Sequence, residues 1–157
     1  MVSLLIGTHA FLGELAGIGF LWILIELLNP TIERINRAKI ISLIAVILFL
    51  LSWLIGGFYY VNSYGPNVKP IIKEGPQPWA HSVIMETKEH IFLFLPFLAI
   101  FASAILWKHS KIILKNNKLR IAIILLSGLI FLLTFAIGGM GYLISSGARA
   151  GLEAKVI

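Results

Sequence analysis

Two histidines open matching apolar segments of this chain, and they are the residues whose type and spacing are best suited to chemistry. His9 begins the segment HAFLGELA and His90 begins HIFLFLPFLA, so the pattern His-x-Phe-Leu recurs after 81 residues. Imidazole is a common metal ligand and changes its charge near neutral pH. Two copies of one histidine pattern at the start of long apolar segments therefore indicate a pair that acts together.

A second pair of matching segments follows the two histidines. Residues 48–65 (LFLLSWLIGGFYYVNSYG) and 130–147 (IFLLTFAIGGMGYLISSG) share Phe-Leu-Leu, Ile-Gly-Gly and a final Ser-x-Gly. We interpret the chain as two tandem helical hairpins in the same orientation, with repeat one at 1–65 and repeat two at 80–147. The glycine pairs are Gly56 and Gly57 in the first copy and Gly138 and Gly139 in the second.

The composition predicts that these hairpins lie in lipid. Of the 157 residues, 59% are hydrophobic and 13% are charged, which is far from the balance of a soluble domain. Inside hydrocarbon only a helix of about 20 apolar residues satisfies every backbone group within one segment. The sequence therefore predicts an all-α integral membrane four-helix bundle that forms a single domain over 1–157, with the lipid bilayer as its first partner. The expected spans are residues 3–28, 39–62, 90–107 and 120–144.

The distribution of positive charge predicts which side of the membrane each connection faces. Eight of the 13 Lys and Arg residues fall in the turns after the first and third spans, which places these turns in the cytoplasm. Both termini, the tail 146–157 and the segment 63–89 are then extracytoplasmic, in a membrane that we take to be a prokaryotic plasma membrane. Within that segment, residues 63–79 are rich in Gly and Pro and are expected to form an external loop.

The two histidines are predicted to lie at the same depth. His9 is 20 residues before Asn29 and His90 is 18 before Lys108, which places both about 27–30 Å from the inner boundary. A two-fold axis along the membrane normal would make them face each other, with the glycine pairs in the same layer. Two opposed imidazoles beside helix surfaces without side chains are what a bis-histidine haem requires. The sequence therefore predicts one haem b near the outer face, with His9 and His90 as its iron ligands.

Four further polar residues are candidates to support this site. A ligating imidazole usually donates its other N–H to an acceptor that fixes the ring, and Glu86 lies one turn before His90. Glu14 lies within the first span, where an ionisable group needs a partner, so we expect it to contact a quinone or to move a proton. The expected function is one-electron transfer between a quinol or a membrane partner and an extracytoplasmic redox protein. The supporting residues are Glu14, His81, Glu86 and Glu89.

Two other functions are compatible with the same residues. Glycine in membrane helices also mediates close packing, so the chain could be a cofactor-free structural or accessory subunit of a larger membrane complex. Alternatively, imidazole and carboxylate groups could form a divalent metal-binding module at the outer face, because such ligands suit several metals. The candidate ligands of that module are His9, His81, Met85, Glu86, Glu89 and His90.

Several classes of function are disfavoured. The chain has no cysteine, which excludes thiolate metal sites, disulfides and c-type haem attachment. The net charge of +6 is accounted for by the positive turns, without an arrangement typical of nucleic-acid binding. The sequence carries no recognisable pairing of nucleophile and base, so an enzyme that acts alone is not expected.

Overall fold

The computed structural model describes residues 2–155, which are helical except for short connections. Four long helices, each apolar enough to cross a membrane, account for most of the chain. The prediction of an all-helical chain with four long apolar helices is therefore confirmed, and the described residues contain no strand. The elements are α1 (Val2–Leu28), α2 (Ile32–Tyr59), the π-helical η1 (Tyr60–Val68), α3 (Lys69–Glu74), the π-helical η2 (Ala80–Met85), α4 (Glu86–Ile113) and α5 (Asn117–Ala154).

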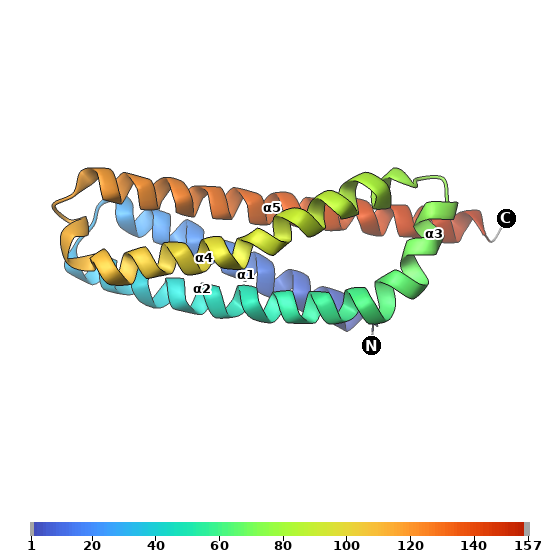
Figure 1. The fold of residues 1–157 in the computed structure, drawn as a ribbon, viewed down its shortest axis with the longest axis horizontal. Helices are drawn as coiled ribbons and strands as arrows, with labels where there is room; N and C mark the ends of the chain where they lie inside the picture. Colours follow the sequence, from blue (N-terminus) through green and yellow to red (C-terminus); the bar gives the residue numbers. More distant parts are fainter. Residues whose placement is uncertain (1, 156–157) are drawn as a thin grey trace.

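The four long helices form a bundle in which each packs on two others (Figure 1). Helix α1 packs on α2 and α5, and α4 also packs on α2 and α5, so the order around the bundle is α1, α2, α4, α5. The core between them consists mainly of aliphatic side chains, with the ring centroids of Phe20 and Phe49 6.1 Å apart and the rings tilted by 30°. Small residues allow close approach, as at Gly17, which lies against Thr134 of α5.

A network of charged side chains fixes the turn between α1 and α2. Thr31 caps α2 by accepting a hydrogen bond from the backbone N–H of Arg34 at 3.2 Å. The buried carboxylate of Glu26 accepts hydrogen bonds from Arg34 at 2.7 Å, from Arg37 at 2.8 Å and from the Trp22 indole at 3.0 Å. Glu26 therefore ties the end of α1 to the start of α2. We call this end of the bundle the turn end.

The segment predicted as a loop at 63–79 is instead mostly helical. The π-helical η1 continues directly from α2, and α3 follows it as far as Glu74. From the start of α2 the chain is therefore helical until residues 75–78, which form the connection to η2. Pro66 lies within η1, and Pro70 is the second residue of α3, which continues from η1 because the Lys69 N–H donates to the Tyr64 carbonyl. Both prolines therefore lie within one continuous helical segment.

The C-terminal tail also differs from expectation, because α5 continues beyond residue 146 to Ala154. Two glycines let this extension pack on α3 and η2: a Cβ atom at Gly147 would lie 2.6 Å from Cβ of Ala80, and one at Gly151 would lie 2.5 Å from the carbonyl oxygen of Ile71. Residues 156 and 157 of the predicted tail lie outside the described residues. We call η1, α3, η2 and the end of α5 the cap.

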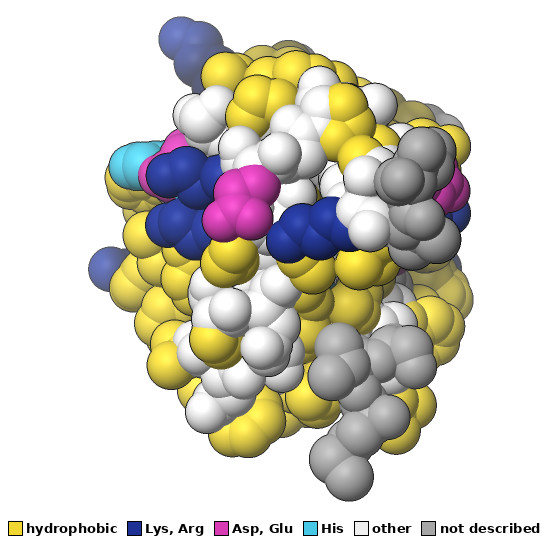
Figure 2. Space-filling model, turned by 90° about the vertical axis from the view of Figure 1, so that its right-hand side faces the viewer, with side chains coloured by type: hydrophobic (Ala, Val, Ile, Leu, Met, Phe, Trp, Pro, Cys, Tyr) yellow, Lys and Arg dark blue, Asp and Glu magenta, His cyan; other side chains and the backbone are white. Residues whose placement is uncertain are grey.

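Charged side chains of both signs gather on the surface of the cap (Figure 2). One ion pair there joins Lys155 to Glu74 at 3.3 Å and so links α5 to α3. A small second core lies beneath this surface, where Tyr64, Ile72, Ala80 and Ile144 are buried together. The cap is therefore a packed part of the fold with its own apolar interior.

Candidate functional site

A large cavity lies between the long helices at the cap end of the bundle. In Figure 1 the pair α1 and α2 separates from the pair α4 and α5 toward the end that carries α3. The cavity has a volume of about 1050 Å³ and its wall, formed by α1, α2, η1, α4 and α5, is mostly apolar. Its charged or imidazole side chains are His9, Glu14, Lys88, Glu89 and Arg149.

His9 is fixed in the wall of this cavity by backbone and side-chain contacts. Its Nδ1 lies 2.9 Å from the carbonyl oxygen of Ser52 and 3.0 Å from the Ser52 hydroxyl, which itself donates to the His9 carbonyl at 2.8 Å. Because a carbonyl only accepts, Nδ1 carries the proton and donates, and Nε2 keeps its lone pair. The ring of Phe92 packs edge-on against the imidazole, with centroids 5.3 Å apart. His9 thus presents a ring of defined tautomer and orientation.

His90 lies outside the cavity. Its side chain is exposed, and its Nδ1 lies 2.6 Å from the backbone carbonyl of Glu86 in the preceding turn of α4. The residues of α4 that line the cavity include Lys88, Glu89 and Phe92. His90 follows Glu89, so its side chain points in a direction about 100° further around the helix axis and away from the cavity. The structure therefore brings His9 to the cavity but not His90.

The two glycine pairs are placed differently in the two halves. A Cβ atom at Gly56 would lie 2.6 Å from Nδ1 of His9, whereas one at Gly138 would lie 3.2 Å from Oε1 of Glu14. The contact between histidine and glycine in the first half thus has no counterpart between His90 and Gly138 among the described contacts. Gly57 also lines the cavity, and Gly139 does not; a Cβ atom on either would meet no atom of residues 2–155 within 4 Å.

Acidic and basic groups share the cavity wall. Glu89 has one carboxylate oxygen that is buried and has no hydrogen-bond partner within residues 2–155. Such an oxygen calls for a proton or for a polar group on a bound molecule. Lys88 and Arg149 line the same space, and sequence reasoning missed Arg149 because it counted that residue only among the charges outside the two short turns.

His81 belongs to the cap and supports it from within. The side chain is 2% exposed, with Nδ1 3.0 Å from the Tyr64 hydroxyl and Nε2 3.5 Å from a carboxylate oxygen of Glu86. Glu86 therefore meets His90 through its backbone and His81 through its side chain. Across residues 2–155, no three His, Asp or Glu side chains are gathered closely enough to hold a metal ion. The alternative of an outer-face metal module gains no support from this arrangement.

Comparison with family models, with curated proteins and with solved structures gives no match to this chain. Its function is therefore argued from the cavity and its residues.

Proposed function

We propose that the chain is an integral membrane protein whose cavity binds one b-type haem through Nε2 of His9, for one-electron transfer. The observation that carries this proposal is the hydrogen bond from Nδ1 of His9 to the Ser52 carbonyl in the cavity wall. Metal-ligating histidines commonly donate their second nitrogen to a backbone carbonyl in this way, which fixes the ring and raises the basicity of the free nitrogen. His9 is thus prepared to act as a ligand.

The shape and charge of the cavity support a large planar guest with acidic substituents. Gly57 leaves a stretch of helix surface open, against which a porphyrin can lie, whereas His9 covers the surface at Gly56 and Glu14 lies against Gly138. Lys88 and Arg149 line the same cavity and would pair with its propionates through charge-assisted hydrogen bonds. The haem iron would supply the one-electron chemistry, and the residues of this chain would hold and orient the group.

His90 would hold the haem only if α4 took another orientation, because in the structure His90 does not line the cavity. A bis-histidine site requires α4 to turn by about one residue, so that His90 takes the place of Glu89. The π-helical η2 immediately precedes α4, and each π turn holds about one residue more than an α turn. If the π turns of η2 became α turns, the extra residue would pass into α4 and turn that helix by about 100° around its axis. The proposal therefore assigns His9 as a ligand and makes His90 the second ligand only after such a rotation.

The surface of the bundle supports its location in a membrane. Large apolar side chains remain more than 60% exposed around the helices, including Phe94, Phe97, Leu125 and Leu132. Such a surface is unfavourable in water and suits contact with lipid chains. The order of the helices around the bundle is also unchanged when α1 is exchanged with α4 and α2 with α5, as two parallel hairpin repeats require.

We place the turn end in the cytoplasm, and the cap and both termini on the outer side of a prokaryotic plasma membrane. The support is the concentration of Lys and Arg near the two short turns. Fusions of alkaline phosphatase and of green fluorescent protein to the C-terminus test this orientation. An active phosphatase fusion and a dark fluorescent fusion are expected, and the reverse pattern would overturn the orientation. The electron donor would be a quinol or a membrane partner, with Glu14 as a polar contact in the cavity, and the acceptor an extracytoplasmic redox protein.

Titration of the detergent-purified protein with haem tests the binding site. We expect saturation at one haem per chain, a large loss of affinity in His9→Ala, and no change in His109→Ala, whose histidine lies near the turn end. Absence of saturable binding, or equal binding by the His9→Ala variant, would overturn the haem site. A chain that binds no haem but purifies with other subunits would instead favour the cofactor-free accessory role.

A further inference from the structure

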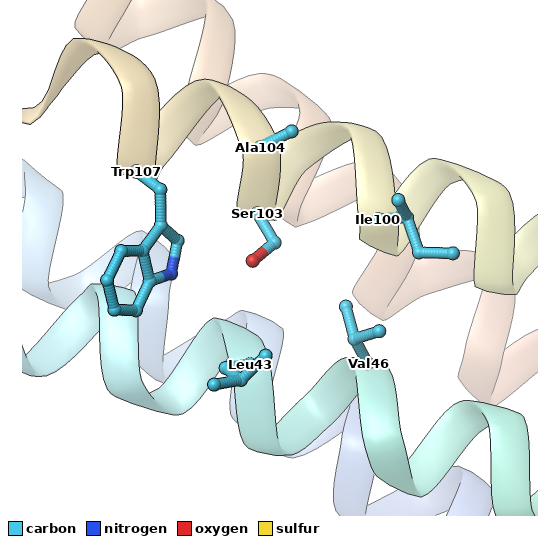
Figure 3. A pocket seen from close by; sticks show the side chains of 6 residues that line it. All are labelled: Leu43, Val46, Ile100, Ser103, Ala104 and Trp107. Carbon is cyan, nitrogen blue, oxygen red and sulfur yellow. The ribbon is translucent and has the colours of Figure 1, made fainter.

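A second hollow lies between α2 and α4 near the turn end, separate from the cavity at His9 (Figure 3). Its volume is about 430 Å³, and we call it the α2/α4 groove. The groove follows α2 from Leu43 to Val46, and α4 from Ile100 to Trp107. Its lining residues are Leu43, Val46, Ile100, Ser103, Ala104 and Trp107.

The serine hydroxyl groups at the floor of the groove are paired within the protein and do not offer free hydrogen-bond donors to the groove. The Ser42 hydroxyl donates to the Lys39 carbonyl at 2.7 Å and accepts from Ser103 at 2.9 Å, so both hydroxyls use their protons within the protein. In Figure 3 the Ser103 side chain points toward α2, in agreement with this bond. Leu43 and Ile100 form walls that are 48% and 43% exposed. An open groove with apolar walls and satisfied floor hydroxyls suits a hydrocarbon chain.

The groove ends in positive charge at the turn end. Nζ of Lys39 lies 4.5 Å from the centroid of the Trp107 ring, and the Trp107 indole donates to the Lys39 carbonyl at 3.2 Å. Lys111 lies one turn beyond Trp107 on the same face of α4 and is exposed. Each of the two helices therefore carries a lysine one turn beyond its last groove-lining residue, Lys39 in α2 and Lys111 in α4. An ammonium over an indole still has N–H groups that can donate to an anion.

We propose that the α2/α4 groove binds an anionic phospholipid, with one acyl chain in the groove and the headgroup phosphate at Lys39 and Lys111. The groove is complementary to such a lipid, because its apolar walls match the acyl chain and the two lysines beside the Trp107 indole match the negative headgroup. This inference rests on the membrane location in the proposed function and is independent of the haem.

Native mass spectrometry of the protein, extracted from membranes and supplied with phosphatidylglycerol or phosphatidylcholine of identical chains, tests the inference. We expect phosphatidylglycerol to bind more tightly, and each of Lys39→Gln and Lys111→Gln to weaken it about fivefold and to weaken phosphatidylcholine less, because the choline group offsets the charge of its phosphate. Lys118→Gln is the matched control, because it removes an exposed positive charge near the same end but from α5. Equal binding of the two lipids by the unmodified chain would overturn the inference.

Filling the groove tests the acyl-chain half of the inference. Ala104→Trp and the milder Ala104→Leu are expected to reduce binding of both lipids, with the larger side chain giving the greater loss. Helicity by circular dichroism shows that each variant is folded, and the leucine variant serves if the tryptophan variant is not. Unchanged lipid binding in a folded Ala104 variant would contradict a chain in the groove. Failure to recover the unmodified chain from the membrane fraction would instead contradict the membrane location itself.

Discussion

The imidazole of His9 occupies the space that a side chain at Gly56 would take, since a Cβ atom there would lie 2.6 Å from Nδ1. This close approach of α1 and α2 lets Nδ1 reach the carbonyl of Ser52, one turn before Gly56 in α2. The lack of a side chain at one position of α2 therefore sets the tautomer and direction of a histidine on α1. The proposed haem site depends on that relationship.

The variant Gly56→Ala tests it directly. The added methyl group would displace the imidazole from Ser52, so we expect a loss of about 1–3 kcal/mol in the free energy of unfolding and weaker haem binding. Thermal unfolding and haem titration in the same detergent measure both effects. Gly139→Ala is the control, because its Cβ atom meets no described atom within 4 Å and the residue does not line the cavity. Equal behaviour of the two variants would contradict the role of Gly56.

A second close contact joins α1 to α5. A Cβ atom at Gly17 would lie 2.7 Å from Cγ2 and 2.9 Å from Cβ of Thr134, whose rotamer is held by a 2.7 Å hydrogen bond to the Ile130 carbonyl. Gly17→Ala is expected to lower the free energy of unfolding by about 1–3 kcal/mol. Combination with Thr134→Ala should restore part of this loss, because it removes Cγ2 but not Cβ. Gly7→Ala, at an open position, should have little effect, and a double variant no more stable than Gly17→Ala would argue against this packing.

The buried carboxylate at the turn end is expected to stabilise the α1–α2 hairpin. Glu26→Gln removes the charge that Arg34 and Arg37 both contact, so it leaves two guanidinium groups without their partner. We expect a lower Tm than that of Glu153→Gln, which removes an exposed carboxylate from the far end of α5. The haem site, at the other end of the bundle, should be unaffected. Equal melting temperatures for the two variants would show that the cluster adds no stability.

The cap is expected to depend on the glycines of the α5 extension. Gly151→Ala would place Cβ 2.5 Å from the Ile71 carbonyl oxygen, so α3 has to move away from α5. Hydrogen exchange should then become faster over residues 69–74 and remain slow in the core of α2. Gly139→Ala, which adds Cβ to open space on the same helix, is the control. Unchanged exchange in α3 would contradict the docking of the cap on α5.

The positions of the four long helices could be predicted from the sequence, because length and hydropathy set them, but several of their ends could not: α2 begins at Ile32 rather than 39, and α5 ends at Ala154 rather than 144. Thr is a common residue at the start of helices, and Thr31 caps α2 by accepting from the N–H of Arg34. The rule that proline and glycine break helices failed for residues 63–79, where Pro66 in η1 and Pro70 in α3 both lie within one continuous helical segment.

The candidate site was predicted in part. Residue counts along the helices give the depth of a side chain but not its direction around the helix axis. His9 and the glycines at 56 and 57 line the cavity, whereas Lys88 and Glu89 occupy the side of α4 on which His90 was expected. One extra residue in the π-helical η2 changes that direction by about 100°. Repeat symmetry in the sequence could not reveal this difference.

The most direct test of the central claim is the visible spectrum of the dithionite-reduced protein, purified in detergent after expression with ample haem, beside His9→Ala and His90→Ala. The account predicts the absorption bands of a b-type haem in the unmodified protein and their loss in His9→Ala. The spectrum of His90→Ala then reports whether α4 turns to supply the second ligand: it changes from low-spin to high-spin if His90 binds and stays the same if it does not. A colourless unmodified protein, or haem bands that survive in His9→Ala, would contradict the account.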